Sequence, residues 1–217
     1  MMKKQNNLPK RIIMSIVGVL LCAISVGFFK FAALGVDPFQ SLMAGLDALI
    51  PIRFGTLYII VNAVLLVFAL IFDRHYIGIA TFINLFLLGY IAEYSLKLLV
   101  FLMPSPHIAI RIASLIIAVI MNCIAASLYI TADLGVSTYD AVALIIVNTW
   151  KKGKFRYVRI ITDIVCILIG IATFLISGGK IIQVPTIVGI GTIITAFFMG
   201  PLIEFFNVHL SGKILKQ

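Results

Sequence analysis

The sequence predicts an all-α, polytopic bundle of transmembrane helices built from two homologous repeats. Hydrophobic residues make up 62% of the chain and charged residues 12%, whereas a soluble domain is about half apolar and about a quarter charged. Apolar runs long enough to cross the ~30 Å hydrocarbon core recur along the chain. Residues 78–93 (GIATFINLFLLGYIAE) recur as residues 189–204 (GIGTIITAFFMGPLIE), with two glycines, a threonine and a glutamate aligned. A membrane protein with such a duplication usually binds its substrate where the two copies meet.

Composition narrows the classes of function. The net charge of +9 does not indicate a nucleic-acid partner, because the basic residues flank apolar runs, where they orient helices and meet anionic lipid. The sequence has no Walker, HExxH or GxSxG motif, and its three cysteines lack metal-ligand spacing. We therefore expect no enzyme, no cofactor and no metal site. The expected partners are the bilayer, anionic lipid at basic loops and an unknown small-molecule or ion substrate, and homo-oligomerisation stays open.

The chain divides into five segments by composition. No small-residue cleavage site follows the basic start, so the first apolar run is interpreted as a retained helix. Pro104 and Pro106 break the helix between the repeats. We expect a multi-pass protein of the bacterial inner (plasma) membrane with both termini cytoplasmic. The segments are the basic N-terminus (1–11), repeat 1 (12–103), a linker (104–107), repeat 2 (108–206) and the C-terminus (207–217).

Each repeat contains the same four elements in the same order. A long apolar run predicts a spanning helix, and a turn and a short apolar segment follow it. A second long run and the duplicated helix complete the repeat. The elements are residues 12–34, 37–50, 55–72 and 77–103 in repeat 1, and residues 108–134, 137–150, 157–176 and 185–206 in repeat 2.

The short segments leave two topologies open, because they fall below the ~20 residues that cross comfortably. If they cross, about eight membrane segments span the bilayer and the repeats are parallel. If they are half-helices, six full spans remain and the repeats are inverted. Short connectors, and a larger share of Lys and Arg placed inside, favour eight crossings. Eight crossings place Arg53 inside and Arg74 outside, and six crossings place them the other way round.

The two turns, LGVDPFQS (34–41) and LGVSTYDA (134–141), are the sharpest local signal. Gly35 and Gly135 permit the positive φ that a tight reversal needs. Asp37 precedes a proline and is predicted to cap the short helix, and Ser137 or Thr138 is predicted to cap its counterpart. Free N–H groups at such a helix start attract anions, and an ordinary capped hairpin is the alternative. Because Asp37 is itself negative, the second turn is the better anion candidate.

Polar residues at matched repeat positions are the candidates for substrate or ion binding. Gln40 aligns with Asp140, and Asn62 aligns with Asp163. Polar groups at bilayer depth are costly, so they are usually retained for function. We expect these four residues and Asp37 to face one another across a central site. For Asn62, a hydrogen bond that holds two helices together is the alternative. For Asp163 the alternative is an i,i+4 ion pair with Arg159.

Glu93 and Glu204 form a second matched pair, each four residues after a glycine. Proton or cation coupling is one interpretation. The favoured one is an interfacial carboxylate paired with a basic neighbour, such as Lys97 after Glu93. Small residues let helix backbones approach closely, so the glycines of the duplicated helices are predicted to pack against neighbours. They are Gly78, Gly89, Gly189, Gly191 and Gly200.

Five motifs carry a family resemblance: the two turns, GTLYIIVN at residues 55–62, and the GIATFINLFLLG and GIGTIITAFFMG helices. With these motifs the chain resembles the YczE/YyaS/YitT group of bacterial membrane proteins. The second turn has STYD where the group often has GPWD, and retains only the aromatic–acid pair. The resemblance implies an inner-membrane protein related to transport.

We therefore expect a small bacterial membrane transporter or permease-like protein, with a site between its two repeats and an unknown substrate. The alternative is a non-transporting scaffold, a chaperone, or an accessory or substrate-binding subunit of a larger complex. A cavity lined by the matched polar residues favours transport, whereas a solid core with an exposed glycine groove favours the scaffold.

Overall fold

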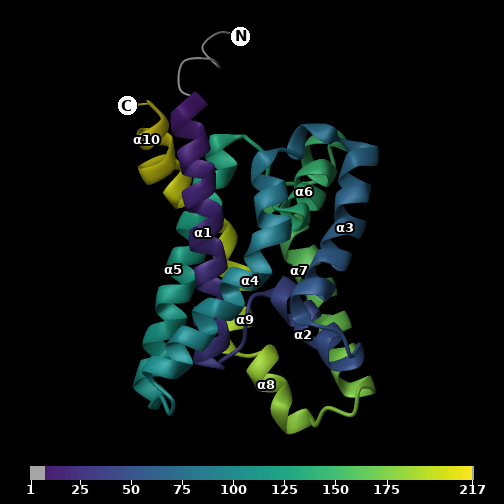
Figure 1. Ribbon diagram of the computed structural model, residues 1–217. Coiled ribbons are helices and arrows are strands. Elements are labelled where there is room, and N and C mark those ends of the chain that lie inside the picture. The colour runs from purple at the N-terminus through teal and green to yellow at the C-terminus, as the bar shows by residue number, and fades with distance from the viewer. Residues whose placement is uncertain (1–7, 217) are drawn as a thin grey trace.

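The computed structural model describes residues 8–216, and the described residues contain helices and no strand. Six of these helices are long and apolar enough to span a membrane (Figure 1). This confirms the predicted all-α polytopic bundle. The six are α1 (Leu8–Ala32), α3 (Phe54–Phe72), α4 (Ile79–Leu102), α5 (Ile108–Ala132), α7 (Phe155–Ile176), and α9 (Ile190–Phe206) with its helical flanks.

Shorter elements connect the long helices. α2 and α6 correspond to the two short segments of the sequence, and α6 continues as a π-helix, η2. The others are single turns, or the short helix that ends the described chain. In order, the short elements are α2 (Pro38–Leu49), η1 (Arg74–Tyr76), α6 (Thr138–Leu144), η2 (Ile145–Thr149), η3 (Ile181–Gln183), α8 (Val184–Ile187), η4 (Asn207–Ser211) and α10 (Gly212–Lys216).

The first helices of the two halves, α1 and α5, lie antiparallel. Arg11 at the start of α1 donates from Nε to the carbonyl oxygen of Ala132 at the end of α5, at 2.6 Å. Arg111 at the start of α5 donates from Nε to the carbonyl oxygen of Ala32 at the end of α1, at 2.7 Å. Each guanidinium thus satisfies a carbonyl that the helix end leaves without an intrahelical partner. Equivalent helices of parallel repeats would run the same way, so the two halves are inverted.

The favoured eight-crossing topology is therefore wrong, and the structure has the alternative of six full spans and two half-helices. α2 begins near mid-height of the bundle and runs back toward the end of the molecule at which α1 ends (Figure 1). The short connectors do not exclude half-helices, because few extended residues are needed to reach the interior. Residues 34–37 span about 13 Å when extended, at ~3.3 Å per residue. That is enough to reach the interior from the end of α1.

Backbone hydrogen bonds from the opposite half hold both extended segments. Gly191 donates to the carbonyl of Leu34 at 2.9 Å, and Val36 donates to the carbonyl of Ile187 at 3.3 Å. The second half repeats the pattern: Ala80 donates to Leu134 at 3.2 Å, and Val136 donates to Tyr76 at 3.0 Å. Backbone at bilayer depth needs such partners because lipid offers none.

The predicted turn glycines have the expected conformation, with φ of +95° at Gly35 and +104° at Gly135. A Cβ on Gly135 would lie 2.5 Å from the backbone nitrogen of Gly78, and one on Gly35 would lie 2.4 Å from that of Gly189. The packing prediction is therefore confirmed for Gly78 and Gly189. Only glycine fits on either side of these two contacts.

The other duplicated glycines differ. A Cβ on Gly191 would lie 2.6 Å from the carbonyl oxygen of Gly35, which is also close packing. Gly89 makes ordinary van der Waals contact, since its Cβ would lie 3.5 Å from Cα of Gly55. The prediction is wrong for Gly200, where a Cβ would meet no described atom within 4 Å.

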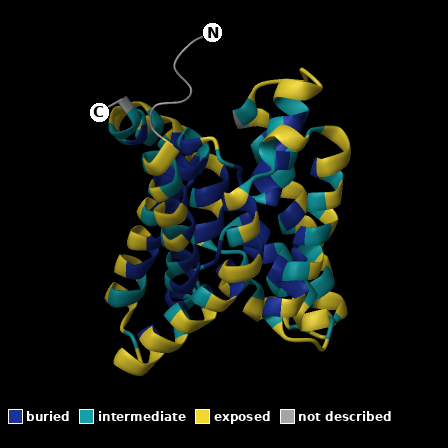
Figure 2. Cartoon of the chain, turned by 45° about the horizontal axis from the view of Figure 1, so that its top comes forward, coloured by how far each residue is buried: buried dark blue, intermediate teal, exposed yellow. Residues whose placement is uncertain are grey.

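Polar contacts gather at the end of the molecule where α1 begins. Thr149 donates to a carboxylate oxygen of Asp73 at 2.6 Å, and Asn148 donates to the hydroxyl of Tyr76 at 2.9 Å. Hydrogen bonds from the Thr149 hydroxyl and the His75 backbone lower the pKa of Asp73. These contacts place the α3–α4 connection beside the last residues of η2, at the same end of the molecule. Elsewhere the outer faces are apolar and exposed, whereas buried residues fill the centre (Figure 2).

The inverted arrangement predicts the sides on which two exposed arginines lie. In membrane vesicles, Arg74→Cys should react with an impermeant thiol reagent from the same side as Lys213→Cys in α10. Arg53→Cys should react from the opposite side. Labelling of Arg53→Cys and Lys213→Cys from one side would contradict the six-span arrangement.

Alanine substitutions at glycines separate backbone strain from crowding. Gly178 has φ of +91°, and a Cβ added there would meet no described atom within 4 Å, so Gly178→Ala should cost only the strain of about 1–3 kcal/mol. Gly135→Ala adds a backbone clash and should lower the thermal unfolding temperature further. Gly200→Ala should change it little. Equal effects of Gly135→Ala and Gly178→Ala would contradict the close approach to Gly78.

Candidate functional site

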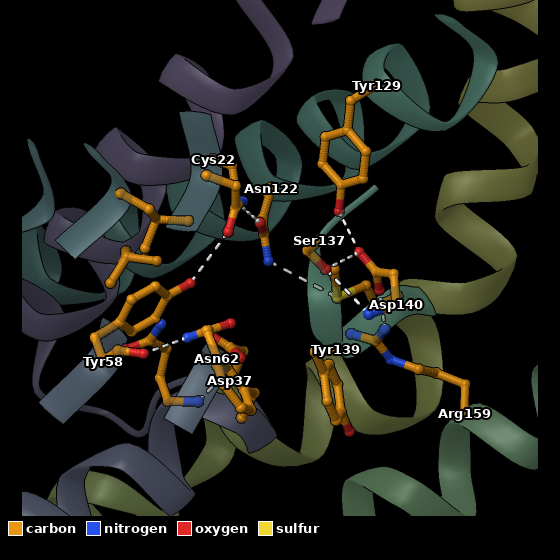
Figure 3. Close-up of a pocket in the computed structure, with 16 residues that line it drawn as sticks. Cys22, Asp37, Tyr58, Asn62, Asn122, Tyr129, Ser137, Tyr139, Asp140 and Arg159 are labelled. Carbon is orange, nitrogen blue, oxygen red and sulfur yellow. Dashed lines mark hydrogen bonds and ion pairs between the residues drawn. The ribbon is translucent and has the colours of Figure 1, made fainter. Parts of the chain in front are cut away.

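A small cavity lies where the two half-helices begin, at the centre of the bundle (Figure 3). Its volume is about 50 Å³. A water molecule needs at least ~10–15 Å³ by this measure, so the cavity has room for a few waters or one small ion. Its lining is unusually polar for the centre of an apolar bundle. The polar lining residues are Cys22, Asp37, Gln40, Tyr58, Asn62, Asn84, Asn122, Tyr129, Ser137, Tyr139, Asp140 and Arg159.

Arg159, on α7, lies between two carboxylates of the second half. Its Nη1 forms an ion pair with Asp140, and its Nε lies 3.3 Å from Oδ1 of Asp163. The exposed side-chain fractions are 11% for Arg159, 7% for Asp140 and 2% for Asp163, so water screens the charges little. Arg159 and Asp163 are one helical turn apart, which puts both on the face of α7 that meets α6.

Hydroxyl groups complete this charged cluster. Tyr129 and Ser137 both donate to Oδ2 of Asp140, at 2.5 and 2.6 Å. Tyr139 donates to Oδ1 of Asp163 at 2.5 Å, and the Arg159 guanidinium lies 4.4 Å from the centre of its ring. Ser137 also caps α6, because its hydroxyl accepts the backbone N–H of Asp140 at 3.0 Å. Every charge in this cluster therefore has an opposite charge or a donor beside it.

Side chains of the protein itself occupy the second helix start, which favours the ordinary capped hairpin over the anion site at this turn. Asp140 lies in the first turn of α6, and its carboxylate occupies the space beside the helix start together with the Ser137 hydroxyl. A further anion there would face Asp140 directly. The predicted cap by Ser137 is confirmed.

The first half has the same geometry with different chemistry. Asp37 caps α2, as predicted, and accepts the backbone N–H of Gln40 at 3.2 Å. Among the described residues it has no Lys or Arg within ion-pair distance. Gln40 is 4% exposed, and its Oε1 is buried without a hydrogen-bond partner in the described structure. This half of the cavity thus contains a carboxylate with no basic partner and an amide oxygen with no donor, among the described residues.

Asn62 connects the halves. Its Oδ1 accepts the hydroxyl of Thr138 at 2.5 Å, and its Nδ2 donates to the carbonyl of Tyr58 at 2.8 Å. The bond to Thr138 on α6 supports the interpretation of Asn62 as a link between helices, whereas the bond to Tyr58 lies within α3. The Tyr58 hydroxyl donates to Oδ1 of Asn84 at 3.3 Å, which brings α4 to the same cavity.

The structure brings Asp37, Gln40, Asn62 and Asp140 around one cavity, and Asp163 lies behind Arg159 as part of the charged cluster. Glu93 and Glu204 are not at this site. The favoured interpretation of Glu93 is confirmed, since it is exposed and lies 2.8 Å from Lys97. Glu204 is exposed beside Lys154 in a surface crevice. No group of His, Cys, Asp and Glu that would suit a metal occurs among residues 8–216.

Several residues of the cavity were not predicted from the sequence. Arg159 was considered only as a partner of Asp163, although a charge within an apolar helix is a functional signal by itself. Asn84 and Asn122 are amides within apolar helices, like Asn62, and the same argument would have found them. Tyr58 and Tyr129 gave no signal, because tyrosine is common in membrane helices.

Breaking the charged cluster should destabilise the protein. Asp140→Asn or Arg159→Met leaves a buried charge with one partner fewer, and such a loss typically costs about 3–5 kcal/mol. Thermal unfolding in detergent should therefore show a clear drop for both variants. The exposed pair offers a matched control, because Lys97→Met should leave the unfolding temperature unchanged. Wild-type stability of Asp140→Asn would contradict the cluster.

Comparisons with curated proteins and with solved structures found no match. A comparison with protein families matches residues 9–208, nearly the whole chain, to DUF6198, a family of unknown function. The matched region contains both half-helices, nearly all of the six long helices and the whole of the central cavity. The chain therefore belongs to the DUF6198 family.

Proposed function

We propose that the protein is a small multi-pass membrane transporter whose substrate occupies the central cavity between its two halves. The observation that carries the proposal is a polar, charged cavity at the meeting point of two half-helices within a bundle of apolar helices. Polar groups at this depth are costly, so they are usually retained for function. Broken helices that begin at the midplane, between inverted halves, are typical of secondary transporters.

Two matched crevices at opposite ends of the molecule support this proposal. One lies at the start of α3, beside α4, and has a volume of about 560 Å³. The other lies at the start of α7, beside α9, and has a volume of about 530 Å³. Phe54 and Glu93 in the first correspond to Phe155 and Glu204 in the second.

Each crevice ends close to the cavity. In the first, Phe54 packs against Tyr58, a cavity residue, with ring centres 6.3 Å apart. In the second, Gly200 and Ile130 directly follow the cavity residues Met199 and Tyr129 in sequence. Residues of each crevice are thus neighbours of residues that line the cavity. Small movements of one half against the other would open one side at a time, which is what a transporter requires.

The glycines favour transport over a scaffold function. Gly78, Gly189 and Gly191 are used inside the molecule, where they contact the turns of the opposite half. They are therefore not available as a groove for a partner helix. Of the duplicated glycines, Gly200 alone meets no described atom within 4 Å, and one such position is a small surface for a partner protein.

Charge supports an orientation with both ends of the chain in the cytoplasm of a bacterial cell. Lys10, Arg11, Arg74 and the loop lysines 151, 152 and 154 lie at the end where α1 begins. Basic residues accumulate in cytoplasmic loops, where they also attract anionic lipid. The resemblance to the YczE/YyaS/YitT group implies the same class of protein and stays a prediction.

A native cysteine tests the proposal without knowledge of the substrate. Cys22 lines the cavity, whereas Cys123 and Cys166 are buried elsewhere. In a Cys123→Ala/Cys166→Ala variant, a small impermeant thiol reagent should modify Cys22 from either side of the membrane, because a transporter exposes its site alternately. The same variant with Cys22→Ala should not react. Modification from one side only, or from neither side, would contradict a transporter.

A further inference from the structure

We infer that the central cavity binds a small monovalent cation, an alkali ion or a small ammonium ion, between Asp37 and Gln40. The inference deepens the proposed function and rests on it, because the cation would be the transported substrate or a co-transported ion. It depends on a difference between the two halves, which place different groups at equivalent positions around one cavity.

The charges around the cavity are not balanced. Three carboxylates (Asp37, Asp140 and Asp163) lie near one guanidinium, that of Arg159. Arg159 is engaged by Asp140 and Asp163, and each of these also accepts a tyrosine hydroxyl. Buried charges need an opposite charge nearby. Asp37 has none within ion-pair distance among the described residues, so a cation in the cavity would supply it.

Gln40 provides an independent indication of a ligand. Its side chain is 4% exposed and lines the same cavity one helical turn from Asp37, and its Oε1 is buried without a donor in the described part of the chain. A buried acceptor without a partner is costly, and such groups are rare in folded proteins. A metal ion or an N–H donor beside Asp37 would satisfy this oxygen as well.

The cavity's size and lining limit the cation. About 50 Å³ suits a bare or partly hydrated ion, not a large organic cation. The rings of Phe39 and Tyr139 stack with centres 4.9 Å apart and form part of the cavity wall. Calcium and magnesium generally take more carboxylate and water ligands than one Asp with an amide oxygen supplies. A single positive charge fits the single carboxylate of Asp37.

The difference in side chains between the two halves explains why the cation site lies on the first half's side of the cavity. Where the first half has Asp37, Gln40 and Tyr58, the second half has Ser137, Asp140 and Arg159 at matched positions. The second half therefore contains its own cation, fixed on α7. The first half has a carboxylate and an amide in the same geometry, with a neutral tyrosine in place of the arginine. A soluble cation would therefore supply to the first half the positive charge that the Arg159 guanidinium supplies to the second half.

Binding to the purified full-length protein tests the inference. Titration calorimetry at constant ionic strength would compare sodium, potassium, ammonium and methylammonium chlorides with choline chloride, whose cation is too large for the cavity. At least one small cation should bind saturably with a stoichiometry of one, and choline should not. Asp37→Asn should weaken this binding at least tenfold, and Gln40→Leu severalfold. Asp73→Asn, an exposed carboxylate far from the cavity, should leave it unchanged.

The inference would be overturned by small cations that behave like choline, or by Asp37→Asn with wild-type affinity. The comparison with choline needs no variant, so it decides even if Asp37→Asn fails to fold. Saturable binding of magnesium or calcium in place of the monovalent ions would also overturn it.

Flux separates this inference from the proposed function. The same protein in liposomes would be tested for uptake of radioactive sodium, rubidium or methylammonium. Saturable binding without uptake of the bound ion or of any co-substrate would support the cation site and contradict the proposed transport function. Uptake that Asp37→Asn leaves unchanged would keep the transporter and overturn the site.

Discussion

The exchange of backbone hydrogen bonds between the two halves is the constraint on which the rest of the structure depends. Two short extended segments enter the apolar interior, where neither lipid nor water can satisfy their N–H and C=O groups. Each finds its partners in the other half: Leu34 bonds to Gly191, and Leu134 bonds to Ala80. The two backbones come so close at each contact that both must have a glycine there: Gly35 against Gly189, and Gly135 against Gly78. Because these segments are held at mid-depth, both half-helices begin there, and their first turns face a common cavity.

The duplicated framework holds two different chemistries. In the second half, a guanidinium, two carboxylates and three hydroxyl groups satisfy one another, so this half is a fixed electrostatic structure. In the first half, a carboxylate and an amide occupy the equivalent geometry, and among the described residues no Lys or Arg lies within ion-pair distance of the carboxylate. Symmetry of the backbone thus positions the site, and the loss of symmetry in the side chains gives it a preference for one kind of ligand.

Much of the fold could be predicted from the sequence, since helix order, turn glycines and caps are local properties. Apolar runs predicted the six long helices, and the residues beside Pro38 predicted the Asp37 cap. The topology could not be obtained in this way, because it depends on where the extended residues of one half find hydrogen-bond partners in the other. The matched polar positions predicted three of the cavity residues, Gln40, Asn62 and Asp140, and the turn beside Pro38 predicted Asp37. Arg159 was interpreted only with its sequence neighbour, because nothing local indicates that Asp140, 19 residues earlier, lies against it.

The same exchange of hydrogen bonds has a consequence for biosynthesis. The first half enters the membrane before the second is synthesised, yet the backbone around Leu34 bonds to residues 187 and 191, near the far end of the chain. The first half therefore cannot reach its final form until the last long helix has been made. Neither half is an independent folding unit. During most of translation, the backbone groups at the end of the first helix therefore lack their final hydrogen-bond partners.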